Sequence, residues 1–104
     1  MNILIKKNID NIAALCKTHK VNSMFLFGSA TNADFSQQSD VDFLVRFSDS
    51  IELMEYADNY FDFLASLENL LQRNVDLVSE KSLKNPVLIK QINKTKKRNA
   101  SFLI

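Results

Sequence analysis

The spacing of hydrophobic residues changes several times along the chain, and each change predicts a different element. Over residues 2–20, apolar residues recur at three- and four-residue steps, which is the spacing of one helix face. Residues 21–27 form a short, mostly apolar run that is typical of a buried strand. In the first half of residues 40–47, polar and apolar residues alternate, and the segment is rich in Val, Phe and Leu. It therefore predicts a second strand. The polar stretch between the two strands, residues 30–39, predicts a loop.

A wide apolar stripe over residues 51–72 predicts the longest helix of the chain. The residues expected to face inward are Leu53, Met54, Ala57, Tyr60, Phe61, Leu64, Leu67 and Leu71. Tyr56, Phe63 and Leu70 lie outside this stripe, so the helix carries more apolar surface than one small core covers. Two interpretations stay open. The helix lies between the sheet and the terminal segments, or it binds a partner, and we favour the partner.

The last third of the chain predicts smaller elements. Residues 75–79 predict a third strand, and Pro86 suits the first turn of a last helix. The basic segment 94–98 is interpreted as a solvated helix end rather than an RNA contact, and residues 100–104 predict a short closing strand. The whole pattern indicates an α+β fold of two layers, a small mixed β-sheet with flanking helices, in one domain over residues 1–104.

Composition narrows the possible classes of function. The 104 residues are 46% hydrophobic and 24% charged, which are ordinary values for a folded globular chain. Thirteen Lys and Arg against twelve Asp and Glu leave a net charge of +1, which argues against direct nucleic-acid binding. The single Cys16 excludes an intrachain disulfide, and no apolar run is long enough for a signal peptide or a membrane span. We therefore expect a cytoplasmic protein with no membrane partner.

Three aspartates, Asp40, Asp42 and Asp76, are the candidate catalytic and metal-binding residues. Residues two apart in a strand point to the same face, which places Asp40 and Asp42 side by side. Two such carboxylates repel each other unless a cation lies between them, and Mg²⁺ binds hard oxygen ligands of this kind. Asp76 completes the group if the third strand lies beside the second, which is the adjacency we expect.

Gly28 and Ser29 directly follow the first predicted strand and are the candidate phosphate-binding residues. Gly28 is the only glycine in the chain, which favours a position where no side chain fits, while turns elsewhere must use Asn, Asp and Ser. A glycine lets a phosphate approach the backbone, and a serine hydroxyl with free N–H groups holds its oxygens. Carboxylates on two strands and a Gly-Ser turn together indicate two-metal phosphoryl or nucleotidyl transfer.

The stretch FLFGSATNADFSQQSDVDFLV, residues 25–45, resembles the signature of the minimal nucleotidyltransferase (MNT) domains of the DNA polymerase beta superfamily. Gly28 and Ser29 match the phosphate-binding pair of that signature. A spacer of ten residues follows, and Asp40 and Asp42 match the metal ligands. The resemblance implies the nucleotidyltransferase fold, Mg²⁺ as the metal and ATP as the nucleotide donor.

The resemblance also implies an activity and a partner. Members of the family transfer AMP from ATP to a tyrosine of a HEPN-domain ribonuclease toxin and act as its antitoxin. Asp76 matches the carboxylate that helps to deprotonate the attacking hydroxyl. The arginine that often follows the Gly-Ser motif is replaced here by Asn32. The alternative is therefore a catalytically weak or inactive binding module that neutralises its partner by occlusion. An antibiotic-modifying transferase is a weaker third interpretation, because such acceptors need a pocket that a further domain supplies.

Three other polar residues have simpler interpretations. Cys16 and His19 lie on the apolar stripe of the first helix, so we interpret both as structural rather than catalytic. Arg46 is an even number of residues after Asp40 and Asp42, so it is expected on the same face of the sheet. There its positive charge would stabilise the carboxylates or a phosphate.

Overall fold

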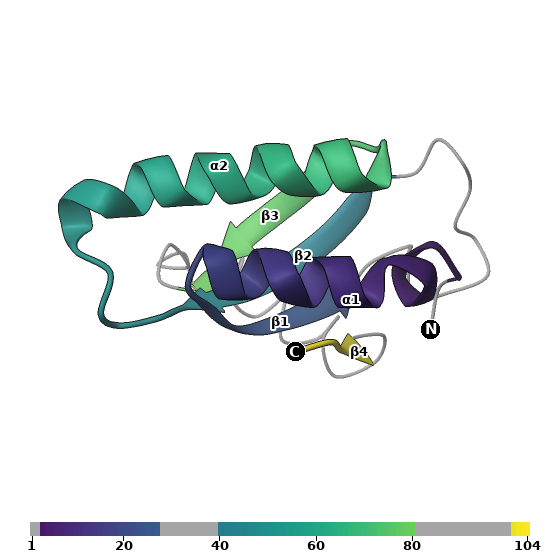
Figure 1. The fold of residues 1–104 in the computed structure, drawn as a ribbon, viewed down its shortest axis with the longest axis horizontal. Coiled ribbons are helices and arrows are strands. Elements are labelled where there is room, and N and C mark those ends of the chain that lie inside the picture. Colours follow the sequence, from purple (N-terminus) through teal and green to yellow (C-terminus); the bar gives the residue numbers. More distant parts are fainter. Residues whose placement is uncertain (1–2, 28–39, 81–100) are drawn as a thin grey trace, which may run out of the picture.

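Two helices cover one face of a four-stranded mixed sheet (Figure 1). The structure, a computed structural model, describes residues 3–27, 40–80 and 101–104. The elements are α1 (Ile3–Thr18), β1 (Val21–Phe27), β2 (Val41–Phe47), α2 (Leu53–Leu71), β3 (Val75–Ser79) and β4 (Ser101–Phe102). The predicted fold class is confirmed. The predicted loop, the last helix and the basic segment lie outside the described residues.

The order of the sheet is β3-β2-β1-β4. β1 runs antiparallel to both β2 and β4, whereas β2 and β3 run parallel. The parallel pair exists because α2 carries the chain back across the sheet before β3 begins, which is the usual way to join parallel strands. The same crossover brings the first residues of β2 and β3 to one end of the sheet. Neither described helix has the length and hydrophobicity needed to cross a membrane.

The core lies between the sheet and the two helices. α1 contributes Ile5, Ile12 and Cys16, each at most 1% exposed. Phe47 of β2 is the centre of an aromatic cluster, with its ring centroid 5.4 Å from that of Tyr56 and 6.1 Å from that of Phe63. Along β2 the residues on the helix side, Val41, Phe43, Val45 and Phe47, are all buried, whereas on the other face Leu44 is buried between half-buried Asp42 and exposed Arg46.

The prediction for the inward face of α2 is wrong in its first half. Leu53, Met54 and Phe61 were expected to face the core, but they are 89%, 88% and 63% exposed. Phe63, which was placed outside the stripe, is fully buried. Helical spacing alone leaves two neighbouring apolar faces possible here. Packing against both α1 and the sheet selects the face that carries Phe63 and Leu67.

The turn after β2 uses Ser48, Asp49 and Ser50, as expected, with the Ser50 N–H donating to the Ser48 hydroxyl, but two other turns use residues that the sequence did not single out. Among the described residues, the non-glycine positions with positive φ are Lys20, at 61°, and Gln72, at 54°. Turn propensity favoured Asn, Asp and Ser, so this expectation is wrong at both positions. Lys20 links α1 to β1, and Gln72 ends α2 by donating its backbone N–H to the Glu68 carbonyl. Each of these residues lies in the short turn between a helix and the strand that follows it.

We expect Gln72→Gly to stabilise the protein by about 0.5–1 kcal/mol. A left-handed backbone conformation costs a non-glycine residue about 1–2 kcal/mol, and glycine avoids this cost. Part of the resulting gain in stability is offset, because glycine has a greater chain entropy in the unfolded state. Urea unfolding followed by circular dichroism measures the change. Gln72→Ala is the control, because it removes the same side chain without relieving the backbone, and a gain equal to that of glycine would contradict the argument.

Candidate functional site

Asp42 and Asp76 lie side by side at one end of the sheet. In the parallel pairing of β2 and β3, the Cα of Asp42 is the partner of the Cα of Asp76. On the other side of β2, the partner of Asp42 is Phe27, the last residue of β1. The expected adjacency of the second and third strands is therefore confirmed, and it brings together two carboxylates that are far apart in sequence.

Both carboxylates point away from the helices. Val41 and Phe43, which flank Asp42, are fully buried on the helix side, and alternation turns Asp42 to the opposite face. Val75 and Leu77 are buried in the same way and turn Asp76 to that opposite face. Asp42 is half-buried and Asp76 is exposed. The pair is thus held on rigid strands and still open to a ligand.

The charged form of the Asp42 carboxyl is disfavoured at this end of the sheet. Burial, followed by the negative charges of Asp76 and Asp40, raises the pKa of Asp42 from 3.8 to about 6. Each of these causes disfavours the charged carboxylate. A bound cation would reverse them, because it favours the charged form. The site therefore has the electrostatic character of a cation site.

Asp40 occupies a less constrained place than expected. It lies one residue before β2 and is exposed, although its charge still acts on Asp42. Within the part of the chain that the structure describes, no three His, Cys, Asp or Glu side chains gather closely enough to hold one metal ion. The geometry accordingly presents a pair, Asp42 and Asp76, with Asp40 nearby. Such a pair fits Mg²⁺, which is usually held by one or two carboxylates together with water and substrate phosphates.

The predicted phosphate-binding residues Gly28 and Ser29 lie outside the described residues, as does Asn32. β1 ends at Phe27, whose Cα partner is Asp42, and Gly28 follows in the chain. The strand that leads to the Gly-Ser motif therefore ends beside the carboxylates.

Arg46 lies on the face of the aspartates, as predicted, but near the other end of β2. Its Nε is 3.8 Å from a carboxylate oxygen of Glu80, and both side chains are more than half exposed. An exposed pair of this kind contributes little to stability. In the structure Arg46 contacts Glu80 rather than either site carboxylate.

Cys16 and His19 have structural environments. Burial raises the pKa of Cys16 to about 11, so its thiol stays protonated and unreactive. The Nδ1 atom of His19 lies 2.8 Å from the carbonyl oxygen of Leu15, and its ring centroid is 5.3 Å from that of Phe63. These contacts support the prediction that neither residue takes part in catalysis.

Two tyrosines that sequence reasoning did not connect to the site fix the position of β3. The hydroxyl of Tyr60 donates to the carbonyl of Leu77, and that of Tyr56 donates to the Ser79 hydroxyl. Leu77 directly follows Asp76, so these contacts hold the strand that carries the second carboxylate. The signal available in the sequence was the four-residue spacing of the tyrosines, which places both on one side of α2.

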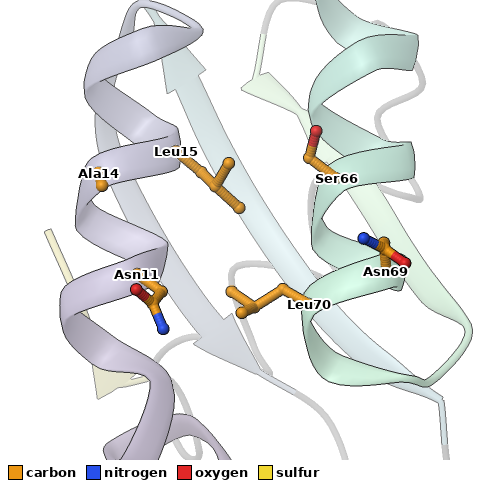
Figure 2. Close-up of a pocket in the computed structure, with 6 residues that line it drawn as sticks. All are labelled: Asn11, Ala14, Leu15, Ser66, Asn69 and Leu70. Carbon is orange, nitrogen blue, oxygen red and sulfur yellow. The ribbon is translucent and has the colours of Figure 1, made fainter.

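The open groove between α1 and α2 is a separate feature of the other side of the sheet. It has a volume of about 470 Å³ and is lined by Asn11, Ala14, Leu15, Ser66, Asn69 and Leu70 (Figure 2). Figure 2 shows that the side chains of Leu15 and Leu70 point into the space between the two helices. Because the helices cover the face opposite to Asp42 and Asp76, this groove is not part of the carboxylate site.

The raised pKa of Asp42 predicts an unusual pH dependence. The folded, metal-free protein keeps the Asp42 proton up to about pH 6, whereas the unfolded chain releases it near 3.8. Folding therefore takes up a proton between these values, so this group makes the folded state less stable as the pH rises through them. We expect Asp42→Asn to be more stable than the wild type at about pH 7.5, with the difference shrinking towards about pH 4.

Urea unfolding in EDTA at a series of pH values measures this effect. Asp10→Asn, which changes an exposed carboxylate on α1, is the control and should leave the wild-type profile unchanged. A loss of stability in Asp42→Asn at neutral pH would show that the carboxylate is not electrostatically disfavoured.

Comparison with known proteins gives consistent results. The family model described as "Polymerase beta, Nucleotidyltransferase" matches residues 10–98. A relative from Methanocaldococcus jannaschii, named "putative protein adenylyltransferase", is 34% identical over 74 residues, which cover 71% of this chain and 72% of the relative. A second relative of the same name from that organism is 33% identical over 78 residues, covering 75% of this chain and 76% of the relative.

Solved structures share the fold. The structure titled as a "putative minimal nucleotidyltransferase" has a TM-score of 0.69 at 29% identity, covering 91% of this chain and 93% of that one. A chain in the structure of a tri-AMPylated Shewanella oneidensis HEPN toxin with its MNT antitoxin has a TM-score of 0.63 at 23% identity. That match covers 95% of this chain and 71% of the other.

Proposed function

Because this chain belongs to the polymerase beta nucleotidyltransferase family, we propose that it is a Mg²⁺-dependent protein adenylyltransferase. It transfers AMP from ATP to a tyrosine of a HEPN-domain toxin and so acts as the antitoxin of that toxin. The observation that carries this proposal is the pairing of Asp42 with Asp76 on neighbouring parallel strands. A pair of carboxylates on one exposed face, next to the end of the strand that leads to Gly28 and Ser29, suits nucleotidyl transfer.

Each site residue has a distinct role in the proposed reaction. Asp42 and Asp76, with Asp40 nearby, would hold Mg²⁺, and the bound ion would supply neutralisation of phosphate charge and activation of the attacking oxygen. Gly28 and Ser29 hold the phosphate oxygens. Asp76 also accepts the proton of the tyrosine hydroxyl, for which its exposed position leaves room.

The proposed reaction forms one bond to phosphorus, breaks another and moves one proton. The tyrosine oxygen bonds to the α-phosphorus of ATP, and the bond from that phosphorus to the oxygen bridging to the β-phosphate breaks. Pyrophosphate leaves with that electron pair, and the hydroxyl proton passes to Asp76 and then to solvent. The products are an AMP-tyrosine ester and pyrophosphate, so atoms and charge balance.

The names of similar proteins support the choice of acceptor and partner. Relatives more than 30% identical carry the name "putative protein adenylyltransferase", and one structural neighbour is a chain of a complex between a tri-AMPylated HEPN toxin and an MNT antitoxin. Of the two paired carboxylates, Asp76 is exposed and Asp42 is half-buried. An acceptor carried by another macromolecule fits such an open site better than a small molecule, which needs an enclosed pocket.

A second candidate function rests on Asn32, which stands where the family often has arginine. Loss of a cation that contacts a phosphoryl group weakens stabilisation of the transition state. In this alternative the chain binds its partner and neutralises it by occlusion, without chemistry.

One experiment tests the proposal and separates the two candidates. The purified chain is incubated with Mg²⁺, ATP labelled at the α-phosphate and a HEPN toxin encoded beside it, and label on the toxin is located by mass spectrometry. The proposal expects AMP on a tyrosine, dependent on both Mg²⁺ and Asp42. If the toxin is neutralised equally well without ATP and without label, occlusion is the function and transfer is not.

A further inference from the structure

We propose that the exposed apolar face of the first half of α2 binds a basic amphipathic helix of a partner protein. This α2 apolar face consists of Leu53, Met54, Ala57 and Phe61. Leu53, Met54 and Phe61 are 89%, 88% and 63% exposed. Steps of three and four residues place all four on one side of the helix. A contiguous row of large apolar side chains in water marks an interaction surface more often than isolated exposed residues do.

A hollow beside this face can receive an apolar side chain. It has a volume of about 270 Å³ and is lined by Tyr56, Ala57, Tyr60, Phe61 and Ser79. The two tyrosine hydroxyls are engaged with Ser79 and with the Leu77 carbonyl, so their rings form the apolar part of the wall. A leucine-like side chain from a partner helix fits a hollow of this size and character.

Charge next to the apolar face selects the partner. Glu55, Asp58 and Asp62 are exposed and follow one another at three- and four-residue steps along the adjacent side of α2. The helix contains no Lys, Arg or His to balance them. A complementary ligand therefore carries Lys or Arg beside an apolar stripe, which is the pattern of a basic amphipathic helix. An acidic helix would be repelled by the same row.

The face lies at the end of the sheet opposite to the carboxylate site. α2 begins near the last residues of β3, as the contact of Tyr56 with Ser79 shows, whereas Asp42 and Asp76 are near the first residues of their strands. A partner helix bound there leaves the carboxylates accessible. The inference therefore does not depend on the proposed transferase activity, and either can fail without the other.

Binding of synthetic peptides tests the inference. The probe is a fluorescently labelled helical peptide with Leu at the apolar heptad positions and Lys at the flanking ones, and anisotropy measures its affinity for the intact chain. Two control peptides are used, one with Glu in place of Lys and one with Gln in place of Leu. We expect the Leu and Lys peptide to bind at least tenfold more tightly than either control. Asp58→Asn/Asp62→Asn should weaken binding and flatten its salt dependence.

Two matched variants decide whether the α2 apolar face is the site. Phe61→Gln should lower the affinity about tenfold, whereas Ile3→Gln, which changes an 83% exposed apolar residue on α1, should leave it unchanged. Circular dichroism verifies that both variants fold. Equal binding of the Lys and Glu peptides, or no effect of Phe61→Gln, would overturn the inference. The inference would also be overturned if the chain self-associates and Phe61→Gln abolishes this self-association. The α2 apolar face would then bind a second copy of the chain.

Discussion

Asp42→Asn is expected to reduce AMP transfer by about 10³-fold, because a metal ion contributes several kcal/mol to stabilising the transition state and each 1.4 kcal/mol corresponds to about tenfold in rate. Asp42 is the central residue of the site, since it is the Cα partner of both Asp76 and Phe27. Burial and the negative charges of Asp76 and Asp40 also disfavour its charged form, which a bound cation would favour. The variant keeps the shape of the side chain and removes only its charge.

The initial rate of label transfer from ATP to the partner measures this effect. Asp10→Asn is the matched control, because it removes an exposed carboxylate from α1, which covers the opposite face of the sheet. We also expect Mg²⁺ with ATP to raise the thermal unfolding temperature of the wild type and of Asp10→Asn, but not that of Asp42→Asn. Transfer by Asp42→Asn at the rate of the control would disprove the assigned metal site.

The second large effect concerns the core. Phe63→Ala is expected to destabilise the protein by about 3–5 kcal/mol, since truncation of a buried Phe loses its apolar burial and leaves a cavity. Phe63 is fully buried and its ring packs against the rings of Phe47 and His19. Small domains have total stabilities of about 5–15 kcal/mol, so a large part of the stability depends on this residue.

Phe61→Ala is the matched control, because it makes the same truncation two residues away. Phe61 is 63% exposed, and we expect its loss to change the free energy of unfolding by no more than about 0.5 kcal/mol. Urea unfolding followed by circular dichroism measures both variants. Similar losses for the two would mean that α2 is rotated relative to the orientation described, with both side chains partly in the core.

The two experiments probe different determinants of the fold and site. Loss of the Asp42 charge should strongly reduce transfer and leave a folded, even stabilised, metal-free protein. Loss of Phe63 should destabilise the fold, so any loss of activity follows the unfolded fraction. The contrast separates chemistry from packing.

Local sequence patterns determined most of the elements and part of the site. The limits of α1, β1, β2, α2 and β3 match the predicted ranges within two residues, because hydrophobic spacing reflects which face of each segment leaves water. The alternation around Asp42 and around Asp76 also predicted correctly that each carboxylate points away from the core, since its apolar neighbours must be buried.

Only the tertiary structure decided which residues meet. The position of Asp76 beside Asp42 depends on the parallel pairing of β2 with β3, which no local pattern encodes. The inward face of α2 was likewise undetermined, because Phe61 and Phe63 are equally apolar and only packing against α1 and the sheet distinguishes them. The spacing of apolar residues thus determines which faces of each helix or strand can be buried. Contacts between segments distant in sequence determine which of these faces is buried and which charged side chains come together.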